Sequence, residues 1–574
     1  MADRIIFHEE SGKIRNISRT GRTVPYVCAA MVTVLLPWLI DFCMLQFLGH
    51  GIFDVVPYFN DEVNYWHLVA DMLEYGKPIG YMGFYGSHAP VGTFGFHGFV
   101  ILLPYYVFAK MFGLHFYTLA ICNMVLVSLA LLSFILLLRP SIKNMLVTGA
   151  LVTLPSMVSK FYSTSMLEGL NVFLAVLFGV LFVKILDTGR KRYMVAAWLL
   201  MVFAVLAKVT WVICVPPLAM VCLKGRLRRR AAGSSFLTVV ISLVGYKVYS
   251  LFSAPYYQSK FMDFRDVFAE RGIVKGSLIM LRETFYDLFR PMLIALRGQD
   301  GEGSLEVLNG LLLYGMFLVL TLWVLRLLYI KYLKKQDIYE ITGLNGRQTA
   351  LLAAAFSVMA IDLAGVAVLY MPIQTIRTAF HSYLFAIVLL SAWNSAQAED
   401  MGYAGETEKT ERSIKIEGSV NAERPEKSVK GAVPLWLRGL FCGLLAVSFV
   451  STVTLCVTGD GFGEKLFWSE QFQEEYDQTK AFLSRYIHLD ESQVGWRNTV
   501  AYMEGTPEIY WMCMPPGTGL NYHVWLSPEY EEQWAMMRTH PKGVLDYETI
   551  YGSFIGAGYQ EVARDENVIV FEKQ

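Results

Sequence analysis

The sequence PYFNDEVNYW, residues 57–66, follows the first long apolar run of the chain and opens an amphipathic helix. Asn60 is a favourable N-cap, and the paired carboxylates of Asp61 and Glu62 complement the positive end of the helix dipole. Gly76-Lys77-Pro78 predicts where this helix ends. Two roles for the acids stay open, helix capping and catalysis, because a carboxylate at a membrane surface can also accept a proton from a substrate hydroxyl.

The apolar run before this helix is one of about eleven in the chain. A helix that crosses a bilayer needs about 20 apolar residues. The first run is too long for a removed signal peptide and lacks a small-residue cleavage site, so we expect it to stay as an anchor. The predicted spans are 24–48, 116–138, 144–159, 167–186, 194–208, 210–223, 233–253, 308–330, 348–371, 379–396 and 434–457. They predict a polytopic all-α membrane protein of about 11 transmembrane helices.

The composition of the 574 residues excludes several classes of protein. Hydrophobic residues make up 55% and charged residues only 17%, whereas soluble proteins have about 25% charged residues. An ordinary soluble enzyme and a disordered chain are therefore excluded. The net charge of zero excludes a strongly basic nucleic-acid binder. No CxxC pair is present, so the cysteines form no zinc or disulfide framework.

The basic residues of the short loops predict the orientation. Lys and Arg are enriched on the cytoplasmic side of membrane proteins. The N-terminal segment carries Arg4, Lys13, Arg15, Arg19 and Arg22, and KGRLRRR at 224–230 is the strongest later signal. We therefore expect a multi-pass protein of the cell membrane with a cytoplasmic N-terminus. An odd number of spans then places the C-terminal segment outside the cytoplasm.

The chain divides into four parts. Residues 1–396 form the predicted transmembrane catalytic body, 397–433 a disordered cytoplasmic linker, 434–457 the last transmembrane helix, and 458–574 a small extracytoplasmic α/β domain. In the last part we expect a helix at 469–487 and strands at 499–503, 509–514 and 567–572. It holds 19 Asp and Glu but 8 Lys and Arg, so the zero net charge combines an acidic outer domain with a basic membrane body.

The first outer loop continues after the helix with a glycine- and aromatic-rich stretch, GYMGFYGSH at 80–88, and with FHGF at 96–99. The apolar segment 100–112, which ends at Gly113, is too short to span. We expect an interfacial helix there. The spacing of His88, His97 and His115 fits no standard metal-ligand pattern, which favours structural roles over a metal site.

These features resemble the GT-C glycosyltransferases, polytopic enzymes that take a sugar from a polyprenyl-phosphate carrier, such as mannosyltransferases and aminoarabinose transferases. The resemblance rests on Asp61-Glu62-Val63-Asn64-Tyr65 after the first span and on two juxtamembrane helices that flank the glycine- and aromatic-rich loop. It continues with Leu206-Ala207-Lys208-Val209-Thr210, followed by Pro216-Pro217, which is similar to the family's "AK-x-T…P" turn. Where members often carry an Arg-Tyr pair, this chain has Arg377-Thr378.

The resemblance implies a mechanism and a set of site residues. Asp61 would act as general base on the acceptor hydroxyl, and Glu62 would support it or help to hold a divalent cation, on which family members differ. Cations would stabilise the departing phosphate. The implied donor-phosphate contacts are Arg377, Lys208 and His381, and the implied substrate contacts are Tyr65, His88, His97 and Arg282. The alternatives are a snorkelling role for Lys208 and lipid-headgroup contacts for Arg377 and the basic segment 254–307.

Two other classes of membrane protein compete with this interpretation. A transporter or flippase usually carries ionisable residues within its spans, whereas the predicted spans hold few beyond Asp362, and no repeat is evident. A polysaccharide polymerase is also polytopic, but such enzymes usually place their main basic outer loop later and lack the early Asp-Glu helix. The expected partners are therefore a polyprenyl-phosphate-linked sugar, an acceptor that is a glycan, lipid or protein, and membrane lipids. No nucleic acid is expected.

Overall fold

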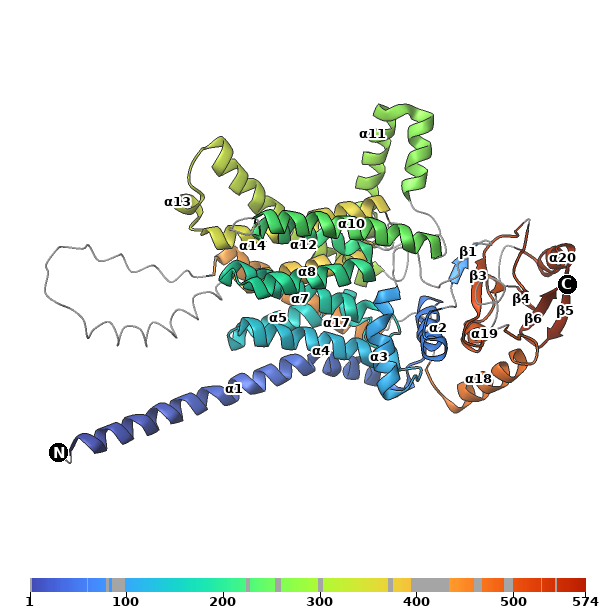
Figure 1. The fold of residues 1–574 in the computed structure, drawn as a ribbon, viewed down its shortest axis with the longest axis horizontal. Helices are drawn as coiled ribbons and strands as arrows, with labels where there is room; N and C mark the ends of the chain where they lie inside the picture. Colours follow the sequence, from blue (N-terminus) through green and yellow to red (C-terminus); the bar gives the residue numbers. More distant parts are fainter. Residues whose placement is uncertain are drawn as a thin grey trace.

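A computed structural model shows a helical bundle with a small sheet at one end, while the N-terminus lies at the other end (Figure 1). The structure describes residues 3–58, 60–78, 82–84, 99–222, 228–252, 260–297, 303–369, 375–393, 433–458, 467–489, 499–527, 529–541 and 545–574.

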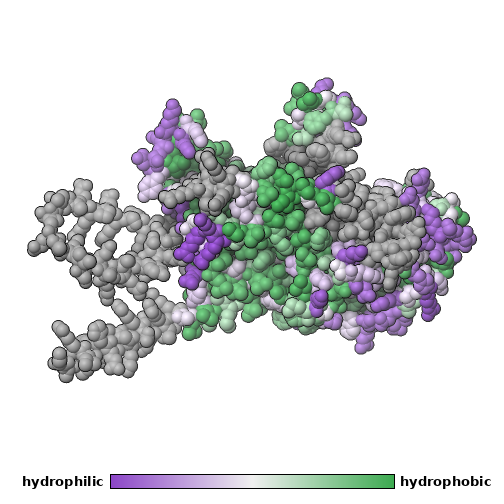
Figure 2. All heavy atoms as spheres, in the orientation of Figure 1, coloured by the Kyte–Doolittle hydropathy of each residue, from purple (hydrophilic) through white to green (hydrophobic). Residues whose placement is uncertain are grey.

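Six of the described helices are long and apolar enough to cross a membrane. They are Thr23–Phe47 in α1 (Asp3–Phe47), α4 (Thr118–Leu138), α7 (Glu168–Thr188), Val307–Leu333 across α12 (Gly303–Leu328) and η4 (Tyr329–Leu333), Gly346–Gly365 in α14 (Gly346–Leu369), and Leu435–Val457 in α17 (Leu435–Thr458). Figure 2 shows hydrophobic side chains over the middle of the bundle and hydrophilic ones over the end that carries the sheet. This pattern fits a belt that faces lipid between two wetter ends.

The remaining predicted spans fall on helices that are either shorter or less apolar than these six. These are α5 (Ile142–Thr153), α8 (Lys191–Ala207), η3 (Val209–Cys214) with α9 (Val215–Cys222), α10 (Arg228–Phe252) and α15 (Thr375–Ser391). Pro155 separates α5 from the short α6 (Ser156–Ser159), because proline cannot continue a helix. Each of the eleven predicted runs thus lies on helix, and the prediction of a polytopic helical membrane protein is confirmed. The sides of the membrane stay a prediction.

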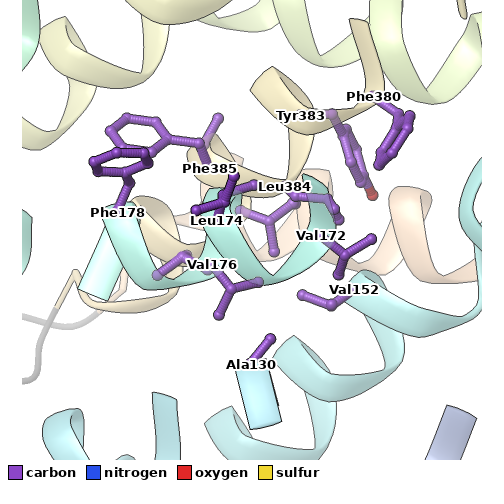
Figure 3. Packing of buried hydrophobic residues seen from close by; sticks show 14 of the residues in the cluster. Ala130, Val152, Val172, Leu174, Val176, Phe178, Phe380, Tyr383, Leu384 and Phe385 are labelled. Atoms are coloured by element: carbon purple, nitrogen blue, oxygen red, sulfur yellow. The ribbon is translucent and has the colours of Figure 1, made fainter. Parts of the chain in front are cut away.

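Helix α7 is the centre of the bundle, where it packs between α4 and α15. Its side chains Val172, Leu174, Val176 and Phe178 face Leu384 and Phe385 of α15 and neighbouring residues of α4 and α5 in Figure 3. A Cβ at Gly179 would lie 2.8 Å from the side chain of Val388. Glycine therefore allows α7 and α15 to approach closely, as small residues do between membrane helices.

The sheet at the end of the bundle has the strand order β1-β3-β2-β4-β6-β5. Its strands are β1 (Met82–Phe84), β2 (Thr499–Met503), β3 (Gly519–His523), β4 (Trp534–Arg538), β5 (Tyr559–Arg564) and β6 (Val568–Lys573), with α18 (Glu470–Leu483), α19 (Glu508–Met512) and α20 (Tyr547–Gly556) beside it. The small mixed α/β domain is therefore confirmed. Strand β1 belongs to the first loop and pairs in parallel with β3, so the outer domain includes a strand from the membrane body.

One strand predicted for this domain is wrong. Residues 509–514 were expected to be extended, but Glu508–Met512 form the short helix α19, which begins after Pro507. A short apolar run cannot be assigned to helix or strand by periodicity alone. The other expectations hold, because β2 and β6 cover the predicted strands and Ser469 caps α18 by accepting a hydrogen bond from the N–H of Phe472.

Helix α2 (Asn60–Tyr75) joins the outer domain to the bundle. It ends at Gly76, whose φ of +72° favours glycine, as its sequence predicted. Three of its side chains reach the outer domain: His67 Nε2 lies 2.8 Å from the carbonyl of Trp511, Asp71 accepts a hydrogen bond from the N–H of Gly517 at 2.5 Å, and Tyr75 donates to the carbonyl of Pro516 at 3.2 Å. The helix that carries Asp61 and Glu62 is thus fixed by the C-terminal α/β domain as well as by the bundle.

The contact between α2 and α19 should make stability depend on pH. Burial lowers the pKa of His67 to about 4, whereas an unfolded histidine titrates near 6.5. The unfolded chain then binds more protons, so the free energy of unfolding falls by about 2 kcal/mol between about pH 7 and about pH 5. We expect His67→Gln to lose this part of the pH dependence in thermal unfolding of the full chain. The exposed His488, replaced by Gln, is the matched control. An equal pH dependence in the two variants would contradict the prediction.

Candidate functional site

The acidic pair lies in the first turn of α2, at the end of the bundle that carries the sheet. Asp61 is half-buried and Glu62 is buried. Glu62 Oε2 accepts a hydrogen bond from the backbone N–H of Ser165 at 3.2 Å. This contact joins two parts of the chain that are far apart in sequence. A role limited to the dipole of its own helix therefore does not account for Glu62.

The segment 159–169, which receives Glu62, connects α6 to α7 and is buried although it is rich in hydroxyl groups. Within the part of the chain that the structure describes, the buried hydroxyls of Ser159 and Ser165 and the buried amide nitrogen of Asn64 have no hydrogen-bond partner. Buried polar groups are usually satisfied, and exceptions tend to mark sites that bind water, an ion or a substrate. The segment that receives Glu62 thus carries hydroxyl groups with hydrogen-bonding capacity left over.

Asn123 of α4 holds this segment in place. Its amide nitrogen contacts the carbonyls of Phe161, Thr164 and Met166 at 3.4, 2.9 and 2.6 Å, and its amide oxygen accepts from the N–H of Gly169 at 3.1 Å. The same oxygen accepts a hydrogen bond of 2.6 Å from the hydroxyl of Tyr105 on α3 (Leu103–Phe112). The side chain of Asn123 therefore substitutes for the backbone partners that this irregular segment lacks.

Gly169 is required at the start of α7 for a steric reason. A Cβ there would lie 2.5 Å from the amide oxygen of Asn123. Sequence reasoning missed both residues of this contact. The available signal was a lone Asn within the otherwise apolar run 116–138.

Lys208 and His381 lie on either side of Trp211. Helix α8 ends at Ala207, Lys208 is extended and buried, and its carbonyl accepts the N–H of Trp211 at 3.1 Å. The indole N–H of Trp211 donates to Asn171 of α7 at 3.2 Å, and the ring centroids of Trp211 and His381 are 4.9 Å apart. His381 is buried, with Nε2 3.5 Å from Asp362 Oδ1. Helices α7, α14 and α15 thus meet around this tryptophan.

The other predicted site residues fall in different places. Tyr65 is buried in the hydrophobic core of the bundle, beside the acidic pair in sequence. Arg377 lies on α15 one turn before His381, but its side chain is outside the described residues, so a shared site of the two stays a prediction. Arg282 is exposed on α11 (Lys260–Arg297), which stands away from the bundle in Figure 1. His88 and His97 lie outside the described residues.

The short apolar helix expected at 100–112 is present as η2 (Phe99–Leu102) and α3, which ends at Gly113 with a φ of +86°. Its position at the membrane interface stays a prediction. No cluster of three or more His, Cys, Asp or Glu side chains that could hold a metal ion occurs within the described ranges. The structure therefore supplies a buried carboxylate that contacts a polar segment, a second carboxylate beside it, and a buried lysine and histidine nearer the centre of the bundle.

The fold is similar to solved membrane-protein structures. ArnT from Cupriavidus metallidurans bound to undecaprenyl phosphate is 12% identical, with a TM-score of 0.47 over 96% of this chain and 98% of that chain. The Archaeoglobus fulgidus oligosaccharyltransferase in the apo form is 12% identical, with a TM-score of 0.44 over 88% of this chain and 64% of that chain. Its AglB complex with an inhibitory peptide and a dolichol-phosphate is 13% identical, with a TM-score of 0.44 over 88% and 65% of the two chains.

These neighbours are glycosyltransferases of the GT-C type, the class that the sequence resembles. No protein-family model matches the sequence, and no curated protein does. At 12–13% identity and TM-scores below 0.5, no residue role transfers from these enzymes to this chain.

Proposed function

We propose that this protein is a membrane glycosyltransferase that transfers a sugar from a polyprenyl-phosphate donor to an acceptor hydroxyl on the extracytoplasmic face. The hydrogen bond between Glu62 and the N–H of Ser165 carries the proposal, because it ties the acidic pair to a buried polar segment at the mouth of the bundle. The donor class follows from the sequence resemblance. The side of the membrane follows from the basic cytoplasmic loops.

The two acids have separate roles in this mechanism. Successive residues of a helix point about 100° apart, so Asp61 and Glu62 cannot face the same partner equally. The hydrogen bond from the N–H of Ser165 holds Glu62, and Glu62 thereby positions the first turn of α2. Asp61, which is less buried, accepts the proton of the acceptor hydroxyl as the oxygen attacks the anomeric carbon. The new bond to the acceptor oxygen forms while the bond between the anomeric carbon and the phosphate oxygen breaks, and polyprenyl phosphate leaves.

The leaving phosphate gains negative charge and requires cations. We assign this role to Arg377 and Lys208, with His381 beside them. A guanidinium can clamp a phosphate with two parallel hydrogen bonds, and Lys208 is fixed where α8 changes to η3. Tyr65, His88, His97 and Arg282 are assigned to the substrates. If the reaction uses a divalent cation, Glu62 would help to hold it, because magnesium needs only one or two protein carboxylates beside water and phosphate oxygens.

Transfer from a panel of donors tests the proposed function. The full chain in lipid nanodiscs would be incubated with polyprenyl-phosphate-linked mannose, glucose, galactose or aminoarabinose and with an extract of envelope glycans. We expect release of polyprenyl phosphate from at least one donor, together with a glycosylated product, both detected by mass spectrometry. Nanodiscs without protein are the control. No release from any donor, combined with solute flux in proteoliposomes, would favour a transporter.

Orientation has a separate test. A cysteine tag at residue 415, within the predicted linker, should react with a membrane-impermeant reagent only after the cell membrane is opened. A tag at residue 540 of the outer domain should react in intact cells. Labelling of residue 415 in intact cells would overturn the orientation and the extracytoplasmic site with it.

A further inference from the structure

A pocket opens between the outer domain and the first loop, apart from the proposed catalytic residues. Its volume is about 470 Å³, within the range of about 300–1,000 Å³ that is usual for ligand sites. It lies where η1 (Ile52–Asp54), α2, the connection between α3 and α4, and α18 meet. Its lining residues are mostly aromatic, and the main ones are Phe53, Trp66, Phe116, Tyr117, Trp468 and Tyr476.

Two of these aromatic residues are open to solvent. Phe53 is 64% exposed and Trp468 is 42% exposed, an unusual state for large apolar side chains that gather at one concave place. Both are held in position. Phe53 packs edge-on against Tyr117 with ring centroids 5.0 Å apart, and the indole N–H of Trp468 donates to Gln473 at 3.1 Å. The rings are therefore fixed before any ligand arrives, which lowers the entropic cost of binding.

Polar groups accompany the rings along one face of α18. Gln473, Tyr476 and Lys480 are spaced by three and four residues, so they share that face, and all three line the pocket. Burial raises the pKa of Tyr476 to about 12, so its hydroxyl stays protonated and can donate a hydrogen bond. Lys480 is the one cation of the described lining, and its ammonium lies 5.7 Å from the ring centroid of Tyr476.

This combination of aromatic rings, polar groups and one lysine favours a sugar ring as the ligand. A pyranose ring has a face of C–H groups, which the negative face of an aromatic ring attracts, and a rim of hydroxyls that need hydrogen-bond partners. A phosphate would require a cluster of cations rather than one lysine that already lies over a ring. An aromatic belt that only anchors the protein to headgroups would spread around the bundle rather than line a cavity beneath the outer domain.

The pocket is close to the acidic pair along the same helix. Trp66 follows Glu62 by four residues, so the two side chains share a face of α2 about 6 Å apart along the axis. The indole N–H of Trp66 donates to the carbonyl of His115 at 3.2 Å. This hydrogen bond fixes the position of the Trp66 ring in the lining of the pocket. A glycan bound in the pocket would thus contact the helix that carries the proposed base.

We propose that this pocket binds a neutral sugar ring of a glycan acceptor. Its role as an acceptor site rests on the proposed transferase function, whereas the binding of a neutral saccharide does not. The enzyme would then add its sugar to an existing glycan, with the preceding ring held between Trp468 and Tyr476.

Titration calorimetry on the full chain in lipid nanodiscs tests the proposal, because common detergents with sugar headgroups would compete. The probes are cellobiose, chitobiose and mannobiose, with octyl glucoside below its micellar concentration to represent a glycolipid headgroup and inorganic phosphate to represent an anion. We expect saturable binding of at least one disaccharide, at least tenfold weaker binding to Trp468→Ala, and unchanged binding to Trp525→Ala, which removes an exposed tryptophan outside the pocket. Tighter binding of octyl glucoside than of every free disaccharide would identify the acceptor as a glycolipid and support the proposal.

Three outcomes would overturn the proposal: no saccharide binds, phosphate binds more tightly than any sugar, or Trp468→Ala binds as well as the natural protein. A repeat with Asp61→Asn separates this proposal from the proposed function. Normal saccharide binding in a protein that transfers no sugar from any donor would refute the transferase but keep the sugar site. Sugar transfer without saccharide binding would keep the transferase but refute the sugar site.

Discussion

Asp61→Asn should lower the rate of sugar transfer by about 10²–10⁴-fold, the usual contribution of a general base. Asparagine keeps the size and polarity of the side chain and remains a favourable residue near a helix start, so α2 should form as before. The acceptor hydroxyl, however, would lose the group that takes its proton. The measurement is the initial rate of polyprenyl phosphate release with an active donor and acceptor.

The matched control is Glu74→Gln, which neutralises an exposed acid on the same helix. We expect near-normal transfer from this variant. The thermal unfolding midpoint of Asp61→Asn should stay close to that of the natural protein, which separates lost chemistry from lost structure. A folded Asp61→Asn protein that transfers sugar at the normal rate would remove Asp61 from the mechanism.

The second large effect is expected at Asn123. Asn123→Ala leaves the carbonyls of Thr164 and Met166 and the N–H of Gly169 without their partner inside the protein. Each buried group left unsatisfied costs about 1–3 kcal/mol, and partial relaxation leaves a total of about 3 kcal/mol. The segment that receives Glu62 should then lose its fixed position. We expect lower thermal stability and a loss of transfer of at least tenfold.

Ser133→Ala on the same helix is the control, because the hydroxyl of Ser133 donates to the carbonyl of Ala130 in its own helix. It should change both properties little. Thermal stability and transfer that are unaffected by Asn123→Ala would show that the segment keeps its shape without this side chain. Contacts other than those of Asn123 would then hold the segment that receives Glu62.

Much of the fold could be predicted because it depends on local pattern. The apolar runs, the proline and glycine breaks and the N-cap at Ser469 each act within a few residues of the chain. The helix 60–75 and its end at Gly76 are of this kind. The failure at 509–514 came from a short apolar run, where helix and strand have the same pattern and the preceding Pro507 decided the outcome.

The site could be predicted only in part for the opposite reason. The acidic pair stood out because two carboxylates follow a membrane span, and Lys208 stood out through a motif. The residues that contact the site residues are distant from them in sequence. Ser165 contacts Glu62, Asn123 contacts the segment 159–169, and Trp211 contacts His381. No local pattern encodes such pairings, so the contact with Ser165 and the clamp by Asn123 required the structure.

The pairing of β1 with β3 also sets an order of assembly. Met82–Phe84 leave the ribosome long before Gly519–His523, yet they occupy one edge of the same sheet. In a nascent chain, the first loop therefore waits for its strand partner while every later predicted span is synthesised. Such long-range closure is slow compared with local folding. The strand that follows the acidic helix thus gains its partner only after Gly519–His523 have been synthesised, so the loop around it is completed late.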